Sequence, residues 1–209
     1  AREFLSHTVD RMAENYLGRR GFNTFAPKTL TETTPIHRIF GGCLKNQLKC
    51  MSCGHCSDKL DAFMDISLDL EKMGPDGSTK KFRSLHAAIE SFTATETLGP
   101  GNEWKCGGCE KLVNAEKNLS VFKPPNALVV HLKRFGIADT TAKIKDHVHF
   151  EPKLNLGVSG PDRRFICYAL CRVVVHKGNS MSHGHYFAYV RSSVGWARMN
   201  DEVVTQASM

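Results

Sequence analysis

The chain has 209 residues, of which 41% are hydrophobic and 23% are charged. Both fractions lie near the globular average, which excludes a disordered tail or a low-complexity polymer. The longest apolar runs, such as residues 127–130, are far shorter than the roughly 20 residues of a membrane helix, and no signal-peptide segment follows Arg2 and Glu3. The net charge of +7 permits an acidic partner without requiring one.

Apolar residues recur at helical spacing near the N-terminus and alternate with polar residues further along. The spacing predicts a helix over residues 2–17 and a second helix that begins after an N-cap at Ser84. Residues 62–70 alternate between apolar and polar and predict a strand whose buried face carries Ile66 and Leu68.

Turn residues divide the remainder of the chain into short segments. Strands are expected at residues 118–122, 127–135, 146–150, 164–176, 185–191 and 195–199. Loops and turns are expected at residues 22–35, 71–83, 124–126, 155–162 and 177–184. The predicted fold class is α+β, with helices early in the chain and a largely antiparallel sheet after them.

Four of the eight cysteines form two Cys-x-x-Cys pairs, Cys50/Cys53 and Cys106/Cys109. Without a signal peptide, and at this chain length, a metal site is favoured over disulfides. Each pair presents two sulfurs to an ion, and two pairs complete the tetrahedron that zinc prefers. Four protein ligands leave no open position, so the predicted zinc is structural. The 52 residues between Cys53 and Cys106 place the pairs on separate hairpins.

The remaining cysteines receive other interpretations. Cys56 also completes a Cys-x-x-Cys with Cys53, but Gly54 favours Cys50/Cys53, which leaves Cys56 and the adjacent His55 outside the site. Cys167 and Cys171 lie four residues apart in a predicted strand, where buried core thiols are expected. Cys43 has no interpretation from its sequence context.

A histidine near the C-terminus has the context of a general base. His185 begins one predicted strand, and Asn200 and Asp201 end the next. If the segment between these strands is a hairpin, His185 and Asn200 lie at the same end, where the amide fixes the imidazole tautomer. Spacing alone is weak support, because most strand histidines are structural, and His176 and His183 flank the same turn.

At these residues the chain resembles the ubiquitin-specific proteases, papain-like cysteine proteases that remove ubiquitin from its conjugates. The resemblance covers nearly the whole chain in order. Residues Ala1–Leu5 are similar to the end of the family's Gln-box. The first half of the fingers is matched by Ile39–Gly42, Cys50, Cys53 and Phe63–Leu70, and the second half by Trp104–Cys109. A buried family strand is matched by Pro125–Phe135, and the His-box by Val175–Gly178, Gly184–Val190 and Trp196–Asp201.

The resemblance implies a papain-like fold of thumb, palm and zinc-braced fingers that grip ubiquitin. It assigns residues 1–35 to the end of the thumb, 36–125 mostly to the fingers and 126–209 to the palm. It implies that a cysteine thiolate attacks the carbonyl after the terminal glycine of ubiquitin. By position His185 resembles the general base, Asn200 the third member of the triad and Asp201 a possible helper.

The chain departs from the family pattern at the nucleophile. The family's nucleophilic cysteine precedes the Gln-box in a Gly-Asn-Thr-Cys-like run, and no cysteine here has that context. Cys43 lies on the other side of the first helix. We therefore expect these residues to be the C-terminal part of a catalytic domain, without most of the thumb, the nucleophile or the oxyanion donor, and to be inactive alone.

Two other functions are open from the sequence. A catalytically inactive relative would bind ubiquitin without hydrolysing a bond, although a dead enzyme has no chemical need of His185 and Asn200. A zinc-ribbon nucleic-acid binder would suit the charge of +7, but the basic residues occur only in short clusters such as 80–83 and no aromatic-basic face is evident. Reduced cysteines without a targeting segment suggest the cytoplasm or nucleus.

Overall fold

The computed structural model describes residues 2–22, 28–74, 76–135, 143–159, 164–178 and 183–208. The helices are α1 (Arg2–Gly18), α2 (Lys28–Thr31), α3 (Pro35–Phe40) and α4 (Leu85–Thr93). The strands of the first half are β1 (Gly42–Cys50), β2 (Cys56–Phe63), β3 (Ile66–Asp69), β4 (Glu71–Met73), β5 (Thr79–Lys81), β6 (Glu96–Leu98) and β7 (Trp104–Lys105). Those of the second half are β8 (Leu112–Val113), β9 (Ala115–Lys123), β10 (Val130–Lys133), β11 (Lys153–Val158), β12 (Arg164–Ala169), β13 (Arg172–Lys177), β14 (His185–Ser192), β15 (Gly195–Asn200) and β16 (Val203–Ala207).

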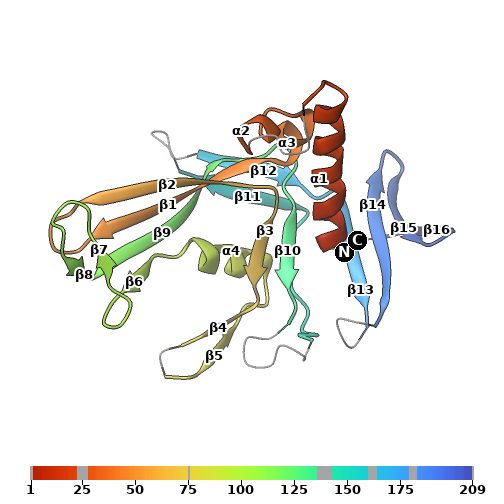
Figure 1. Cartoon of the computed structure of the whole chain (residues 1–209). Coiled ribbons are helices and arrows are strands. Elements are labelled where there is room, and N and C mark those ends of the chain that lie inside the picture. The colour runs from red at the N-terminus through yellow and green to blue at the C-terminus, as the bar shows by residue number, and fades with distance from the viewer. Residues whose placement is uncertain are drawn as a thin grey trace.

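The largest sheet has the strand order β12-β11-β9-β1-β2, with β6 also paired to β9. Strand β1 lies between β2 and β9 and is antiparallel to both. These three strands, which we call the arm, project from the body of the molecule and carry the short hairpin β7–β8 at their tip (Figure 1). The arm therefore holds the tip at a distance from the rest of the chain.

The main hydrophobic core lies where the arm joins the body. Leu68 is fully buried there with Ile66, Phe82, Ala88, Val121 and Leu156. Helix α4 packs on this core and begins at Ser84, whose side-chain oxygen accepts a hydrogen bond from the backbone N–H of Ala87 at 3.1 Å. Beside it, β3 and β10 pair in parallel, so the second half is not uniformly antiparallel.

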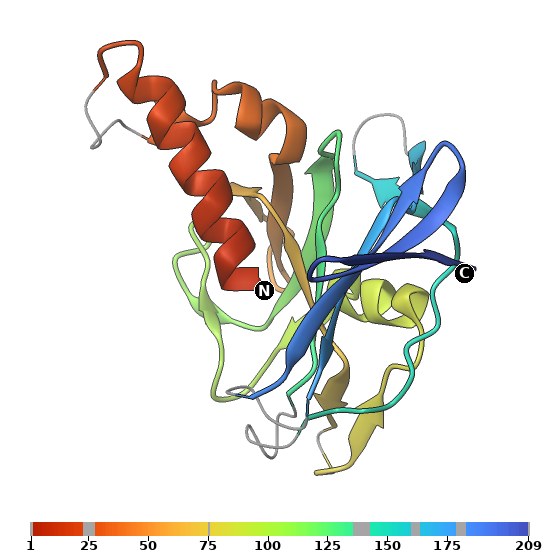
Figure 2. The same ribbon diagram turned by 90° about the vertical axis from the view of Figure 1, so that its right-hand side faces the viewer.

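A separate antiparallel sheet of β13-β14-β15-β16, which we call the histidine sheet, forms the C-terminal part of the chain. Viewed from its own end of the molecule, this sheet lies in front of the arm with α1 to one side (Figure 2). A tight turn joins β14 to β15, with Ser192 opposite Gly195. Gly195 has φ +124°, a left-handed backbone that glycine adopts without a steric penalty.

Several sequence predictions are confirmed. The helix expected over residues 2–17 is α1, which buries Val9, Ala13 and Leu17 on one face. Alternation correctly identified Ile66 and Leu68 as one buried face of β3, but the strand expected over 62–70 is divided at residues 64–65, because β2 pairs with β1 and β3 pairs with β10. The N-cap at Ser84 and the hairpin between the two C-terminal strands are also present.

The loops expected in the first half contain regular structure. Within residues 71–83, β4 and β5 form a hairpin in which Glu71 pairs with Lys81, a charged ribbon without apolar alternation. The expected loop 22–35 contains α2, and α3 begins at its end because Thr34 caps the helix by accepting from the N–H of His37 at 3.2 Å. Residues 23–27 lie outside the described residues.

Some of the strand and turn predictions for the second half of the chain were also wrong. The turn expected from residue 155 is occupied by β11, and residues 160–163 lie outside the described part of the chain. The strand expected at 146–150 is absent from the described residues there, and His149 makes only one bridge, to Ser84. Strands β1, β2, β6, β7, β8 and β16 were not anticipated, because most are short or exposed and all lack clear apolar alternation.

The strand expected over 164–176 is two strands in different sheets. The chain leaves β11 after Ala169 and pairs with β14 from Arg172, and no glycine or proline marks this change of partner. The prediction that Cys167 and Cys171 are buried was wrong, since both are exposed. Cys167 shares the outward face of β12 with Phe165, whose exposed fraction is 76%.

No helix in the described ranges is long and apolar enough to span a bilayer.

Candidate active site and metal centre

His185 and Asn200 meet at one end of the β14–β15 hairpin. His185 is the first residue of β14 and Asn200 is the last of β15, and the register that pairs Ala188 with Met199 leaves them offset by two positions on one face, so their side chains meet diagonally. The His185 Nε2 atom lies 2.5 Å from the Asn200 Oδ1 atom. The His185 side chain is 47% exposed, which leaves the ring accessible from solvent.

The amide oxygen of Asn200 can only accept, so Nε2 of a neutral His185 carries the proton and Nδ1 carries the free lone pair. The carboxylate Oδ2 of Asp201 lies 3.7 Å from the same Nε2 and is positioned to stabilise a protonated ring. Asp201 has φ +51°, so the chain turns sharply after Asn200 and returns into β16. The arrangement is suited to accepting a proton at Nδ1.

The competing histidines have different surroundings. The ring of His176 stacks on Tyr186 with centroids 4.5 Å apart, and its Nδ1 lies 3.3 Å from the Nζ atom of Lys143. Burial, followed by the charge of Lys143, holds the pKa of His176 below its usual value. His176 is therefore a packed neutral group. His183 is exposed at the end of the turn before His185.

Within the described residues, no hydrogen bond or ion pair joins a cysteine sulfur to His185. Cys43 lies half-buried in β1, next to the base of the arm. Burial makes the largest contribution to raising the pKa of its thiol, and the nearby negative charges of Asp61 and Glu32 raise it further. These surroundings oppose thiolate formation, the reverse of what a nucleophilic cysteine needs.

At the tip of the arm, Cys50, Cys53, Cys106 and Cys109 bring their sulfurs within 4.8 Å of one another. The sulfurs of Cys53 and Cys106 lie 3.7 Å apart. In a tetrahedral site with zinc–sulfur bonds of about 2.3 Å, the sulfurs are separated by roughly 3.8 Å. The spacing and the all-thiol donor set therefore fit a zinc ion, and Cys50 and Cys106 are almost fully buried.

Two equivalent backbone turns build this cluster. The N–H of Cys50 donates to the carbonyl of His55 at 2.8 Å, and the N–H of Cys106 donates to that of Lys111 at 3.0 Å. The residue after each second cysteine is left-handed, Gly54 with φ +75° and Glu110 with φ +59°. The sequence argument for Gly54 thus has a counterpart in Glu110, which residue type alone did not reveal.

Backbone donors also favour charged sulfur at the cluster. The N–H of Cys53 donates to the sulfur of Cys50 at 3.3 Å, and this bond contributes most to lowering the pKa of Cys50 to about 6. The N–H of Gly108 donates to the sulfur of Cys106 at the same distance. Cys56 lies outside the cluster, with its sulfur directed to the carbonyl of Gly54.

His55 has a packing role that sequence reasoning missed. Its ring stacks on Trp104, with centroids 6.4 Å apart and planes within 10°. A Cβ atom placed on Gly108 would lie 2.8 Å from the Cβ of His55, so Gly108 permits the close approach of the two turns. The only sequence signal for this contact was the small residue between the second pair of cysteines.

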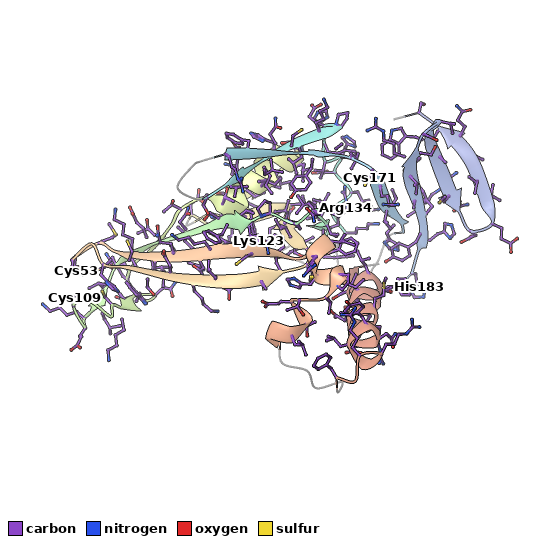
Figure 3. All side chains as sticks on the ribbon, turned by 90° about the horizontal axis from the view of Figure 1, so that it is seen from above. Cys53, Cys109, Lys123, Arg134, Cys171 and His183 are labelled. Carbon is purple, nitrogen blue, oxygen red and sulfur yellow. The ribbon has the colours of Figure 1, made fainter. Side chains whose placement is uncertain are left out.

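The two clusters occupy opposite ends of the molecule. Cys53 and Cys109 lie at the tip of the arm, whereas His183, two residues before His185, lies beside α1 and the histidine sheet (Figure 3). The candidate metal centre is therefore remote from the candidate base.

Comparison with known proteins matches the whole chain to one family. The family described as ubiquitin carboxyl-terminal hydrolase matches residues 1–209. Ubiquitin carboxyl-terminal hydrolase 42 of Homo sapiens is 35% identical over 100% of this chain and 15% of its own length. Ubiquitin carboxyl-terminal hydrolase 23 of Arabidopsis thaliana is 42% identical over 83% of this chain and 19% of its own length.

Solved structures agree with these relatives. The SAGA Ubp8/Sgf11/Sus1/Sgf73 DUB module bound to ubiquitin aldehyde contains a chain with a TM-score of 0.78 and 27% identity, over 100% of this chain and 45% of that chain. A related module bound to monoubiquitin gives a TM-score of 0.80 and 29% identity, over 100% and 44%. The chain spans less than half the length of these relatives.

Proposed function

We propose, from the premise that the chain belongs to the ubiquitin carboxyl-terminal hydrolase family, that it forms the base-bearing part of a thiol-dependent deubiquitinase. The proposed reaction hydrolyses the peptide or isopeptide bond after the C-terminal glycine of ubiquitin. The observation that carries the proposal is the 2.5 Å contact between His185 and Asn200 at an accessible hairpin end.

In this proposal, Nδ1 of His185 takes the proton from a cysteine thiol, and the thiolate forms a bond to the carbonyl carbon. The protonated ring then gives this proton to the leaving amine as the carbon–nitrogen bond breaks. Water, deprotonated by the same nitrogen, hydrolyses the thioester and releases the carboxylate and the thiol. Asn200 fixes the ring through Nε2, and Asp201 stabilises its charged form.

The nucleophile and the oxyanion donor are proposed to come from polypeptide that precedes these residues in a longer protein. Two observations support this: no described thiol is hydrogen-bonded to His185, and the relatives are more than twice as long as the matched region. A Cys–His pair lowers the pKa of a thiol well below about 8.5, so such a cysteine would be charged at neutral pH.

The metal proposed for the arm is one structural zinc held by Cys50, Cys53, Cys106 and Cys109. The 3.7 Å separation of Cys53 and Cys106 and the buried, hydrogen-bonded sulfurs of Cys50 and Cys106 support this assignment. With four protein ligands the ion has no open position for a substrate, so it would brace the tip of the arm and take no part in the reaction.

The proposed partner is ubiquitin, free or attached to other proteins. The solved relatives are described as bound to monoubiquitin and to ubiquitin aldehyde. Together with the division predicted from the sequence, this suggests that the fingers within residues 36–125 and the palm within 126–209 hold ubiquitin, while residues 1–35 end the thumb.

Turnover of a ubiquitin C-terminal fluorogenic amide tests the proposal. A chain extended through the upstream cysteine should hydrolyse the amide, and the 209 residues alone should not. His185→Ala in the extended chain should lower kcat at least 10²- to 10⁴-fold, the usual contribution of a general base. His86→Ala, a histidine on α4 with a 77% exposed side chain, is the matched control and should leave kcat unchanged.

Two results would contradict the proposal. Thiol-dependent turnover by the 209 residues alone would place the nucleophile within them. An extended chain that binds ubiquitin but does not turn over the amide would instead identify an inactive ubiquitin-binding relative.

A further inference from the structure

The side chain of Lys143 binds the end of β13, where the turn that precedes His185 begins. Its Nζ atom donates to the carbonyl oxygen of His176 at 2.7 Å and to that of Gly178 at 3.0 Å. The third neighbour is Nδ1 of His176, at 3.3 Å. An ammonium group has three donors, and these three acceptors match them. Lys143 therefore satisfies backbone groups where β13 ends and its pairing with β14 stops.

The position of Lys143 is itself fixed by the body of the molecule. Phe135 and Lys143 form an isolated antiparallel bridge directly after β10. The guanidinium of Arg134 donates to the carbonyl oxygens of Ile144 and Asp146, at 3.3 and 2.9 Å. The ammonium group thus projects from a segment that is held by the two residues directly after β10.

The contacts continue from Lys143 toward His185 through His176. A Cβ atom placed on Gly184 would collide with the ring of His176, so this ring lies directly against the residue before His185. The same ring stacks on Tyr186, the residue after His185. His176 therefore packs against both neighbours of the proposed base.

The contact between Lys143 and His176 also defines the tautomer of His176. Because an ammonium group can only donate, Nδ1 of His176 must accept and the ring must be neutral. Burial and the Lys143 charge lower the pKa of His176, in agreement with a neutral ring. Burial is also the largest cause of a lowered pKa of Lys143, and the positive charges of Arg134 and Lys145 lower it further.

We propose that Lys143 is a positioning residue that, through His176 and Gly178, sets the location of the His185 ring relative to the attacking thiol. This inference rests on the proposed function of His185. Without the ammonium group, two carbonyl oxygens and one ring nitrogen lose their donor, and the His176 ring, which packs against Gly184 and Tyr186, can shift and move His185 away from Asn200. Small displacements of a reacting group lower kcat by up to about 100-fold.

The test uses the extended, active chain and three substitutions. Lys143→Met removes the charge and all donors at similar length, whereas Lys143→Arg retains both. Lys145→Met is the matched control, because Lys145 is an exposed lysine of the same segment. For the ubiquitin fluorogenic amide we expect Lys143→Met to lower kcat about tenfold or more with little change in KM. Lys143→Arg should recover most of kcat, and Lys145→Met should match the parent chain.

A second readout separates positioning from general destabilisation. The rate at which a small haloacetamide alkylates the nucleophilic thiol reports its thiolate fraction, which the nearby imidazolium increases. The pH midpoint of alkylation should rise by about one unit or more in Lys143→Met and stay constant in Lys145→Met. If Lys143→Met does not fold, Lys143→Gln, which keeps a neutral donor, should show a smaller change in the same direction.

The outcomes distinguish the two proposals. If the parent chain is active, His185→Ala is inactive and Lys143→Met retains the parent kcat and alkylation midpoint, the role of Lys143 is wrong while that of His185 stands. A loss of kcat that is matched by a higher KM, with an unchanged alkylation midpoint, also contradicts positioning. If neither turnover nor alkylation depends on His185, both proposals fall.

Discussion

The tip of the arm and the end of the histidine sheet each bring together reactive side chains, but in opposite ways. At the tip, four sulfurs face one another, two of them almost fully buried, and the set is complete. At the histidine sheet, the His185 ring is 47% exposed and one of its nitrogens has Asn200 as its partner. A complete donor set with two buried sulfurs favours a structural ion, and an accessible ring with a fixed tautomer favours chemistry.

The two ends also differ in how the chain builds them. Each half of the cysteine cluster is a local turn closed by its own backbone hydrogen bonds. The contact between His185 and Asn200 instead depends on the register of two long strands and on the packing of His176 behind the turn. The cysteine end should therefore respond to changes mainly through stability, and the histidine end mainly through activity.

The largest expected effect is the loss of the metal from the arm. Cys106→Ser removes a buried sulfur, and structural zinc contributes roughly 10 kcal/mol or more in isolated zinc fingers. We expect about one zinc per chain in the parent, none in the variant, and rapid proteolysis within residues 45–115. Cys56→Ser is the control and should retain the metal, since Cys56 lies outside the cluster. Equal zinc content in Cys106→Ser and the parent would contradict the assignment.

Next in size is the loss of the amide that fixes His185. In the extended chain, Asn200→Ala should lower kcat on the order of 10- to 100-fold, because the ring loses the acceptor at Nε2. The melting temperature should stay close to that of the parent, since the pair is accessible to solvent. Asn155→Ala, at an exposed position of β11, controls for loss of an amide elsewhere. If Asn200→Ala instead lowered the melting temperature strongly and left kcat unchanged, Asn200 would act on stability, and the histidine sheet would not differ from the cysteine cluster in the expected way.

A smaller effect is expected at Gly108. Gly108→Ala places a methyl group 2.8 Å from the Cβ of His55, and overpacking of this kind usually costs about 1–3 kcal/mol. Zinc affinity and the melting temperature of the arm should both fall. Gly107→Ala is the matched control, because its nearest neighbouring atom would be 3.9 Å away. If both variants bind zinc equally, the close packing of the two turns does not matter to the site.

The smallest effect is expected at Asp201. Asp201→Asn removes the carboxylate 3.7 Å from Nε2 but keeps a residue type that tolerates the left-handed backbone at this position. The side chain is 74% exposed, so solvent screens its charge, and kcat should fall about fivefold or less. Steady-state turnover of the fluorogenic amide measures this change, and a loss as large as that of Asn200→Ala would exchange the roles of the two residues.

The sequence was most informative where one local rule decided the structure. The twin Cys-x-x-Cys pairs specify turns whose geometry is local, and the structure does bring those four residues together. The two strands on either side of the β14–β15 hairpin were also expected from the sequence. Whether these cysteines bind zinc and whether His185 and Asn200 catalyse stay predictions, as do the domain boundaries and the expected location in cytoplasm or nucleus.

The errors arose where tertiary contacts override local pattern. Leu170 and Cys171 separate β12 from β13, and we call this interruption the Leu170–Cys171 break. It contains no turn residue, because the chain changes its partner strand there from β11 to β14. The exposed thiols of Cys167 and Cys171 were expected to be buried because the strand's apolar face was assumed to be covered. Lys143 gave no signal at all, since a single lysine acquires its role only from carbonyl groups more than 30 residues later in the chain.

The Leu170–Cys171 break has a mechanical consequence. One continuous stretch of chain passes from the arm's sheet into the histidine sheet without a flexible linker. The N–H of Leu170 is anchored to Pro152 at 2.9 Å, and the carbonyl of Cys171 is anchored to Arg191 at the same distance. The two sheets are therefore joined by a two-residue connection in which each residue is hydrogen-bonded to a neighbouring segment, so a displacement of the large sheet at Ala169 reaches β13 within three residues.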